Sequence, residues 1–176
     1  GNGNAPSRQS SIPQGAVKVL PSADLYPPIL LSDDWYDPVP LPSTINTAGG
    51  EDSAFVLPDG KTLYFFFTPN VTVPVEKQLL DKVTGIWVSR MVNGSWSEAT
   101  RVVLEDQGRL ALDGCPCVQG GQMWFCTARE GYSGVNLFTA EFVNGRWANW
   151  QYAGDKLNKE YQVGEMHLTA DGKQLY

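Results

Sequence analysis

The apolar residues of the chain come in short runs that are separated by turn residues. Residues 54–57 and 63–67 (LYFFF) are two such runs, and residues 58–61 (PDGK) lie between them. Proline fixes φ for the start of a turn, and glycine accepts the positive φ that a tight turn requires. The pattern therefore predicts two antiparallel strands joined by a short turn.

A second hairpin is predicted at residues 86–91 and from Trp96 onward. Asn93 and Gly94 lie between its two segments, and Asn-Gly between apolar strands is a strong hairpin signal. Together the four strands predict one antiparallel meander. The run 63–67 is apolar throughout instead of alternating, which is typical of a sheet that is covered on both faces.

The four-strand pattern recurs along the chain. The matching segments are residues 93–96 (NGSW) with 144–147 (NGRW), 58–64 (PDGKTLY) with 170–176 (ADGKQLY), and 35–38 (WYDP) with 96–99 (WSEA). A period of about 50 to 60 residues that is built from short strands indicates a propeller or another repeat array.

These repeats resemble a known family. The pattern of residues 52–53 (DS) and 58–65 (PDGKTLYF), an Ile-Trp-Val-Ser strand, an Asn-Gly turn and Trp96 is similar to the WD-like propeller repeats of Tol-B type periplasmic proteins. The resemblance implies an all-β fold, namely a β-propeller fragment of four-stranded antiparallel blades with two full blades and the start of a third. It covers about residues 35–176 and leaves residues 1–34 as an N-terminal tail and lead-in segment.

The number of repeats bears on assembly. Propellers usually have four to eight blades, whereas the sequence stops at Leu175 and Tyr176, inside the second predicted strand of the third unit. We therefore expect the remaining blades to belong to a longer chain, or to further copies that close the ring as a homo-oligomer.

Charge and hydropathy limit the partners. The formal net charge of the 176 residues is −6, which repels phosphate backbones and disfavours nucleic acid. No apolar run approaches the roughly 18 to 20 residues that cross a bilayer, so no membrane span is expected.

The three cysteines bear on the compartment. If residues 119–122 form the turn of the second unit, Cys115 lies opposite Cys126 and the pair can form a disulfide, which leaves Cys117 over. A disulfide favours an extracytoplasmic location: periplasmic, cell-surface or secreted. The alternative is that all three are small buried hydrophobic residues. A zinc site is disfavoured because the usual Cys spacing is missing.

Acidic residues precede the innermost predicted strand of each unit. Asp52, Asp113 and Glu165 hold these positions, with His167 two residues further on. Innermost strands converge on the axis of a propeller, so these side chains could bind a ligand or a cation such as Ca²⁺. The alternative is that each carboxylate accepts backbone N–H groups at its own strand start. Glu165 and His167 alternate to one side of a strand and could form a metal or acid–base pair; otherwise His167 is a packed histidine.

The predicted loops between second and third strands, residues 68–85 and 127–134, differ most between units. The second carries Arg129, Glu130 and Tyr132, which we place among the ligand-binding candidates. Arg129 could instead form an ion pair with Glu130 or with an acid of a neighbouring blade.

The tryptophans have two interpretations. Those in register at Trp35, Trp96 and Trp147 are expected in the core. Exposed members of the pair Trp147 and Trp150, like Tyr132, could stack on a sugar ring.

Two functions follow from this pattern. The first is an exported β-propeller binding module that holds a glycan, peptide or protein partner on its loop face. The alternative is a propeller glycoside hydrolase or lyase that uses Asp52, Asp113 and Glu165. The sequence contains no Gly-x-Ser-x-Gly motif, phosphate-binding glycine loop or dinucleotide fingerprint, which favours binding.

Overall fold

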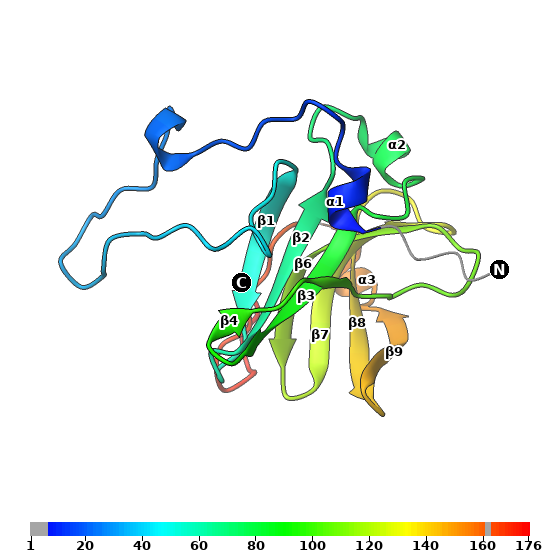
Figure 1. The fold of residues 1–176 in the computed structure, drawn as a ribbon. Helices are drawn as coiled ribbons and strands as arrows, with labels where there is room; N and C mark the ends of the chain where they lie inside the picture. The colour runs from blue at the N-terminus through cyan, green and yellow to red at the C-terminus, as the bar shows by residue number, and fades with distance from the viewer. Residues whose placement is uncertain (1–6, 161–162) are drawn as a thin grey trace.

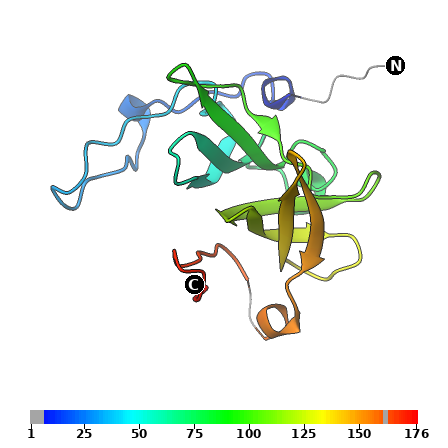
Figure 2. The same ribbon diagram turned by 90° about the horizontal axis from the view of Figure 1, so that it is seen from below.

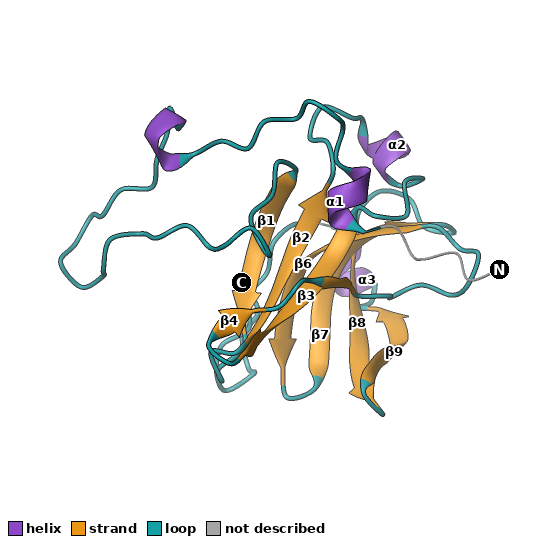
Figure 3. Ribbon diagram, viewed as in Figure 1, coloured by secondary structure: helices purple, strands orange, loops and turns teal. Residues whose placement is uncertain are grey.

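The computed structural model describes residues 7–160 and 163–176. These residues form a mostly β structure with two antiparallel sheets and a few single-turn helices (Figures 1 and 3). The prediction of a fold built mainly from antiparallel strands is therefore confirmed. The predicted N-terminal tail begins at residues 1–6, which lie outside the described residues.

The first sheet is a meander whose last strand is broken. Its strands are β1 (Gly50–Val56), β2 (Thr62–Thr68), β3 (Gly85–Val92), β4 (Ser95–Trp96) and β5 (Thr100–Arg101). Strands β4 and β5 both pair with β3, β4 at Met91 and Val92 and β5 at Trp87 and Val88. They therefore act as one interrupted fourth strand, in the order that the sequence predicts.

The second sheet repeats this order with an unbroken last strand. Strands β6 (Ala111–Gln119), β7 (Gln122–Arg129), β8 (Asn136–Val143) and β9 (Arg146–Tyr152) pair in sequence. The turn at residues 119–122 is where the glycines predict it, and Val118 pairs with Met123.

The two Asn-Gly turns have the same backbone geometry. Asn93 and Gly94 have φ of 50° and 80°, and Asn144 and Gly145 have φ of 51° and 81°. Two successive positive φ values define the turn whose twist matches the flanking strands. This is the physical reason why the two hairpins recur with the same dipeptide.

The main core lies between the two sheets. Tyr64, Ile86 and Val88 from the first sheet meet Phe125 and Phe138 from the second, and all five are at most 8% exposed. Figure 2, seen along the strands, shows the two sheets side by side. One face of each sheet is thus buried against its neighbour, as consecutive blades would require.

The other face of the first sheet is covered by the N-terminal segment. Phe65, Phe67 and Trp87 form a second core there, and the guanidinium of Arg8 lies over all three rings. Arg8, in helix α1 (Arg8–Ser11), is only 4% exposed. The run 63–67 is therefore covered on both faces. The second face is covered by the N-terminal segment, which the sequence analysis interprets as a tail.

Residues 13–44 form a long arm that leaves and rejoins the body (Figure 1). Its one regular element is the 3-10 helix η1 (Pro21–Ala23). Trp35 is 76% exposed and lies in a loop. The prediction that it occupies a core position equivalent to Trp96 and Trp147 is wrong, because Pro38 and Pro40 next to it lack the N–H groups of a paired strand.

The remaining helices are single turns. Helix α2 (Val75–Gln78) lies in the loop between β2 and β3, and helix α3 (Asp155–Asn158) follows β9. Asn158 binds the start of β8: its side-chain oxygen accepts from the Leu137 N–H at 2.7 Å, and its amide donates to the Leu137 carbonyl at 3.2 Å.

Residues 164–176 begin a third hairpin. His167 and Tyr176 exchange backbone hydrogen bonds of 3.0 and 2.9 Å, and Leu168 bridges Leu175. In the turn, Asp171 Oδ1 accepts from the Lys173 N–H, just as Asp59 Oδ1 accepts from Lys61 in the first sheet. The repeat of residues 58–64 at 170–176 therefore extends to the backbone bonds.

Candidate functional site

The first strands of the two sheets share a bulge. Pairing shifts between Asp52 and Phe55 in β1 and between Gly114 and Cys117 in β6. Ser53 and Cys115 are the bulge residues, with φ of 50° and 53°. The third hairpin has its counterpart at Glu165, since His167 pairs with Tyr176 as Phe55 pairs with Tyr64.

These three equivalent residues meet at a small cavity of about 310 Å³, which we call the axial cavity. Ser53 Oγ donates to Glu165 Oε1 at 2.6 Å and lies 3.9 Å from Cys115 Sγ. His167 and Tyr176 are also among the lining residues. Residues at equivalent positions of the three units thus line one cavity, but they are Ser53, Cys115 and Glu165 instead of the three expected acids.

Asp113 is turned away from the axial cavity and is buried. Its side chain is 1% exposed, and its Oδ1 accepts from Arg129 Nη2 at 2.9 Å. Burial raises the pKa of this carboxyl above its usual value, and the Arg129 guanidinium opposes the rise. The expectation that Asp113 binds a ligand is therefore wrong, because the register places it opposite Thr127 on the Arg129 side of the sheet.

The Asp52 side chain accepts a hydrogen bond from the backbone next to it. It is exposed, and its Oδ1 accepts from the Ser53 N–H at 2.7 Å. This is the alternative in which the carboxylate supports its own strand start. The residues at 7–160 and 163–176 contain no group of three or more His, Cys, Asp or Glu side chains that could hold a metal ion. Asp52, Asp113 and Glu165 thus do not form the expected Ca²⁺ site.

The other loop candidates also have partners. Arg129 is bound to Asp113 and lies over the rings of Phe125 and Phe138. It thus forms an ion pair, but the partner is an acid of its own sheet and not Glu130 or an acid of a neighbouring sheet as expected. Glu130 pairs with Arg109 at 2.8 Å on the surface. Tyr132 stacks on Tyr152, with ring centroids 5.4 Å apart.

All three cysteines are free thiols in this structure, so the expected Cys115–Cys126 disulfide is not formed. The predicted register is also shifted, since the bulge places Gly114, and not Cys115, opposite Cys126. The two thiols are nevertheless neighbours. A hydrogen bond from Cys126 lowers the pKa of Cys115, and the same contact raises that of Cys126.

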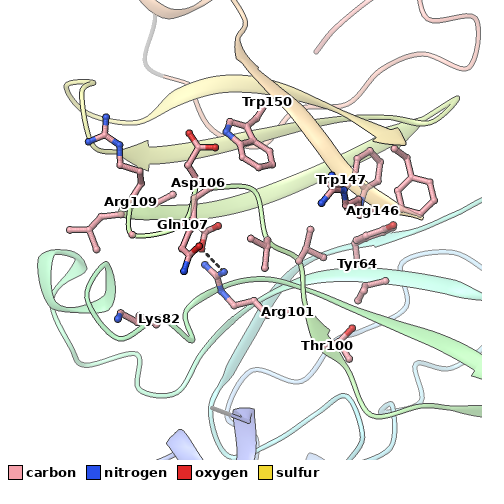
Figure 4. A pocket seen from close by; sticks show the side chains of 18 of the residues that line it. Tyr64, Lys82, Thr100, Arg101, Asp106, Gln107, Arg109, Arg146, Trp147 and Trp150 are labelled. Carbon is pink, nitrogen blue, oxygen red and sulfur yellow. Dashed lines mark hydrogen bonds and ion pairs between the residues drawn. The ribbon is translucent and has the colours of Figure 1, made fainter. Parts of the chain in front are cut away.

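A larger cleft of about 920 Å³ lies between the two sheets at their outer strands, and we call it the inter-sheet cleft. Trp147, Trp150 and Tyr64 line it together with Phe142 (Figure 4). Trp147 is buried, whereas Trp150 is half-buried and Phe142 is 44% exposed. The cleft therefore offers aromatic surface to a ligand.

Basic side chains outnumber acidic ones in this cleft. The basic lining residues are Lys82, Arg90, Arg101, Arg109 and Arg146, and the acidic ones are Glu105 and Asp106. Arg101 is bound to Glu105 and Arg109 to Glu130. Lys82, Arg90 and Arg146 have no ion-pair partner within the described part of the chain, and Lys82 and Arg146 lie at opposite ends of the view in Figure 4.

Sequence reasoning found only part of this cleft. Trp150 was a stacking candidate, but the cations come from segments far apart in the chain: Lys82 from the loop after β2, Arg90 from β3 and Arg146 from the start of β9. Packing of the two sheets brings them together, and no local pattern signals it. The net charge of −6 describes the whole chain, so it does not reveal that the lining of this cleft is mainly basic.

Comparison with known proteins gives no match to a protein-family model, to curated proteins or to solved structures. Within the described residues, no helix is both long and apolar enough to span a membrane.

Proposed function

We propose that this chain is part of an exported β-propeller that binds an acidic glycan in the inter-sheet cleft. The observation that carries the proposal is the combination of Trp150 with the unpaired cations Lys82, Arg90 and Arg146 around one cavity. Sugar rings stack on aromatic faces, and a uronate or sulfate group pairs with Arg or Lys. The same combination disfavours a neutral or cationic ligand.

Three observations support the propeller. The two sheets have the same strand order, their first strands share a bulge, and a third hairpin begins with the same turn. A closed ring needs further blades, supplied by a longer chain or by further copies. The resemblance to Tol-B type repeats agrees with this arrangement and with an extracytoplasmic location.

The test is titration calorimetry with an oligogalacturonate and with its methyl ester, which keeps the sugar rings and removes the charge. We expect the acid to bind and the ester to bind at least about tenfold more weakly. Affinity for the acid should fall with added salt, because the cations that hold it are at the protein surface. Equal affinity for acid and ester would contradict the charge-based part of the proposal.

Two substitutions locate the site. Trp150→Ala should weaken binding of the acid about tenfold or more, since a truncated aromatic anchor loses its stacking surface. Trp124→Ala is the matched control, because Trp124 is half-buried in β7 and does not line the cleft. Equal losses in both variants would exclude the cleft as the binding site.

A further inference from the structure

The thiols of Cys115 and Cys126 form a pair at the edge of the axial cavity. Cys115 is partly exposed and lines the cavity, whereas Cys126 is 5% exposed and Cys117 is 2% exposed. The bulge gives Cys115 a left-handed backbone (φ 53°), which turns its side chain out of the regular alternation. Non-glycine residues rarely adopt this conformation, and such residues gather at functional sites.

The surroundings favour a thiolate at Cys115. Gly114, the ladder partner of Cys126, directly precedes Cys115 in the chain, so the two thiols lie close together. The contact with Cys126 lowers the pKa of Cys115, whereas burial of the thiol and the charges of Glu165 and Asp52 oppose this shift.

We propose that Cys115 and Cys126 form a dithiol redox site, in which Cys115 attacks a small disulfide molecule in the axial cavity and Cys126 resolves the product. The assignment of the attacking thiol rests on exposure: Cys115 faces the cavity, and Cys126 lies behind it. The substrate class is a low-molecular-weight disulfide R–S–S–R, because a cavity of about 310 Å³ admits only a small group.

The reaction balances in two exchanges. The Cys115 thiolate attacks one sulfur of R–S–S–R, the S–S bond breaks, and R–S⁻ leaves and takes a proton from water. Cys126 then loses its proton and attacks the Cys115 sulfur, which releases the second R–S⁻. Two cysteine thiols are oxidised to one disulfide, and the substrate is reduced to two thiols.

The experiment treats the reduced protein with 2-hydroxyethyl disulfide, which is small enough for the cavity, and follows the intact mass. In the parent chain we expect a product two hydrogens lighter, without a stable adduct. In Cys126→Ser a single mercaptoethanol adduct should remain, and peptide mapping should place it on Cys115. Cys115→Ser should be unreactive, and Cys117→Ser, the matched control, should behave as the parent.

A second measurement needs no variant. Brief alkylation of the reduced parent with iodoacetamide should label Cys115 at least about tenfold faster than Cys117, since reactivity follows thiolate character and access. The proposal is overturned if Cys117 reacts as fast as Cys115. It is also overturned if the parent keeps a stable mercaptoethanol adduct, or if Cys115→Ser still oxidises.

Discussion

Ser53 and Cys115 occupy the same bulge position in two consecutive sheets, and their side-chain oxygen and sulfur lie 3.9 Å apart. Both have a left-handed backbone, which side chains with a Cβ atom adopt at a cost of about 1–2 kcal/mol. A strained feature that is repeated in both units indicates that the bulge belongs to the repeat itself. It bends each first strand where the strands converge on the axial cavity.

The bulge predicts effects of different size for two substitutions at Cys115. Cys115→Val should lower the free energy of unfolding by about 2 kcal/mol, because a β-branched side chain is strongly disfavoured at positive φ. Cys115→Gly should stay within about 1 kcal/mol of the parent, since glycine adopts this backbone freely. Urea unfolding measures both values. Similar losses in the two variants would mean that the side chain, and not the backbone, determines stability there.

An acid and an arginine are paired at equivalent places in both sheets. Glu51 pairs with Phe67 in the ladder as Asp113 pairs with Thr127, so the two acids correspond. Asp113 is bound by Arg129 from its own sheet, whereas Glu51 lies 3.4 Å from Arg8 of the N-terminal segment. In the second sheet the arginine comes from the sheet itself. In the first sheet it comes from the distant N-terminal segment.

Removing Arg129 should be costly because it leaves a buried carboxylate without its partner. Arg129→Met should lower the free energy of unfolding at neutral pH by about 3–5 kcal/mol. Asp113→Asn should cost less, and the double variant should cost less than the sum of the two, since the pair is coupled. The matched control is Lys159→Met, which breaks the exposed pair with Asp155 and should change stability by less than about 0.5 kcal/mol. Additive losses at Asp113 and Arg129 would contradict the coupling.

The pH dependence of Asp113 has a defined sign. Burial raises its pKa in the folded state above the ordinary value of 3.8. The folded state therefore binds this proton more readily than the unfolded state, and the resulting stabilisation is complete below the unfolded pKa and lost as pH rises through the folded pKa. Relative to Asp113→Asn, which cannot titrate, the parent should gain stability as pH falls from about 7 to about 4. Urea titrations at several pH values would show a flat difference if the pKa were unshifted.

The sequence predicts the strands and turns well because these depend on local chemistry. The two Asn-Gly turns and the turn at residues 58–61 form as expected. Trp147 is buried, as its repeated position predicts. The predicted site was less accurate, because one bulge residue in β6 changes which side chains face the cavity. That residue exchanges Asp113 for Cys115 at the cavity, and no local pattern distinguishes a bulge from regular alternation.

Contacts between residues far apart in the chain could not be predicted from the sequence, for a different reason. Arg8 lies in a polar segment with the composition of a tail, yet it donates to the carbonyls of Ile45 and Thr44 and covers three aromatic rings of the first sheet. Its role depends on a contact across about forty residues, which neither periodicity nor charge pattern encodes. The cations of the inter-sheet cleft were missed for the same reason.

The arm between Arg8 and β1 gives the last prediction. Tyr36 in the arm is 98% exposed and is followed by Asp37, so chymotrypsin should cut after Tyr36 before it cuts the sheets. Because Arg8 is anchored on the first sheet, the cleaved N-terminal piece should stay bound. The nicked protein should then elute as one species in native gel filtration, while denaturing gels show two pieces.

Arg8→Met removes the hydrogen bonds to Ile45 and Thr44, so nicking this variant should release the piece. Lys18→Met is the control, since Lys18 makes only one bond, to the Asn46 carbonyl. Release of the piece from the nicked parent would show that Arg8 does not anchor the segment.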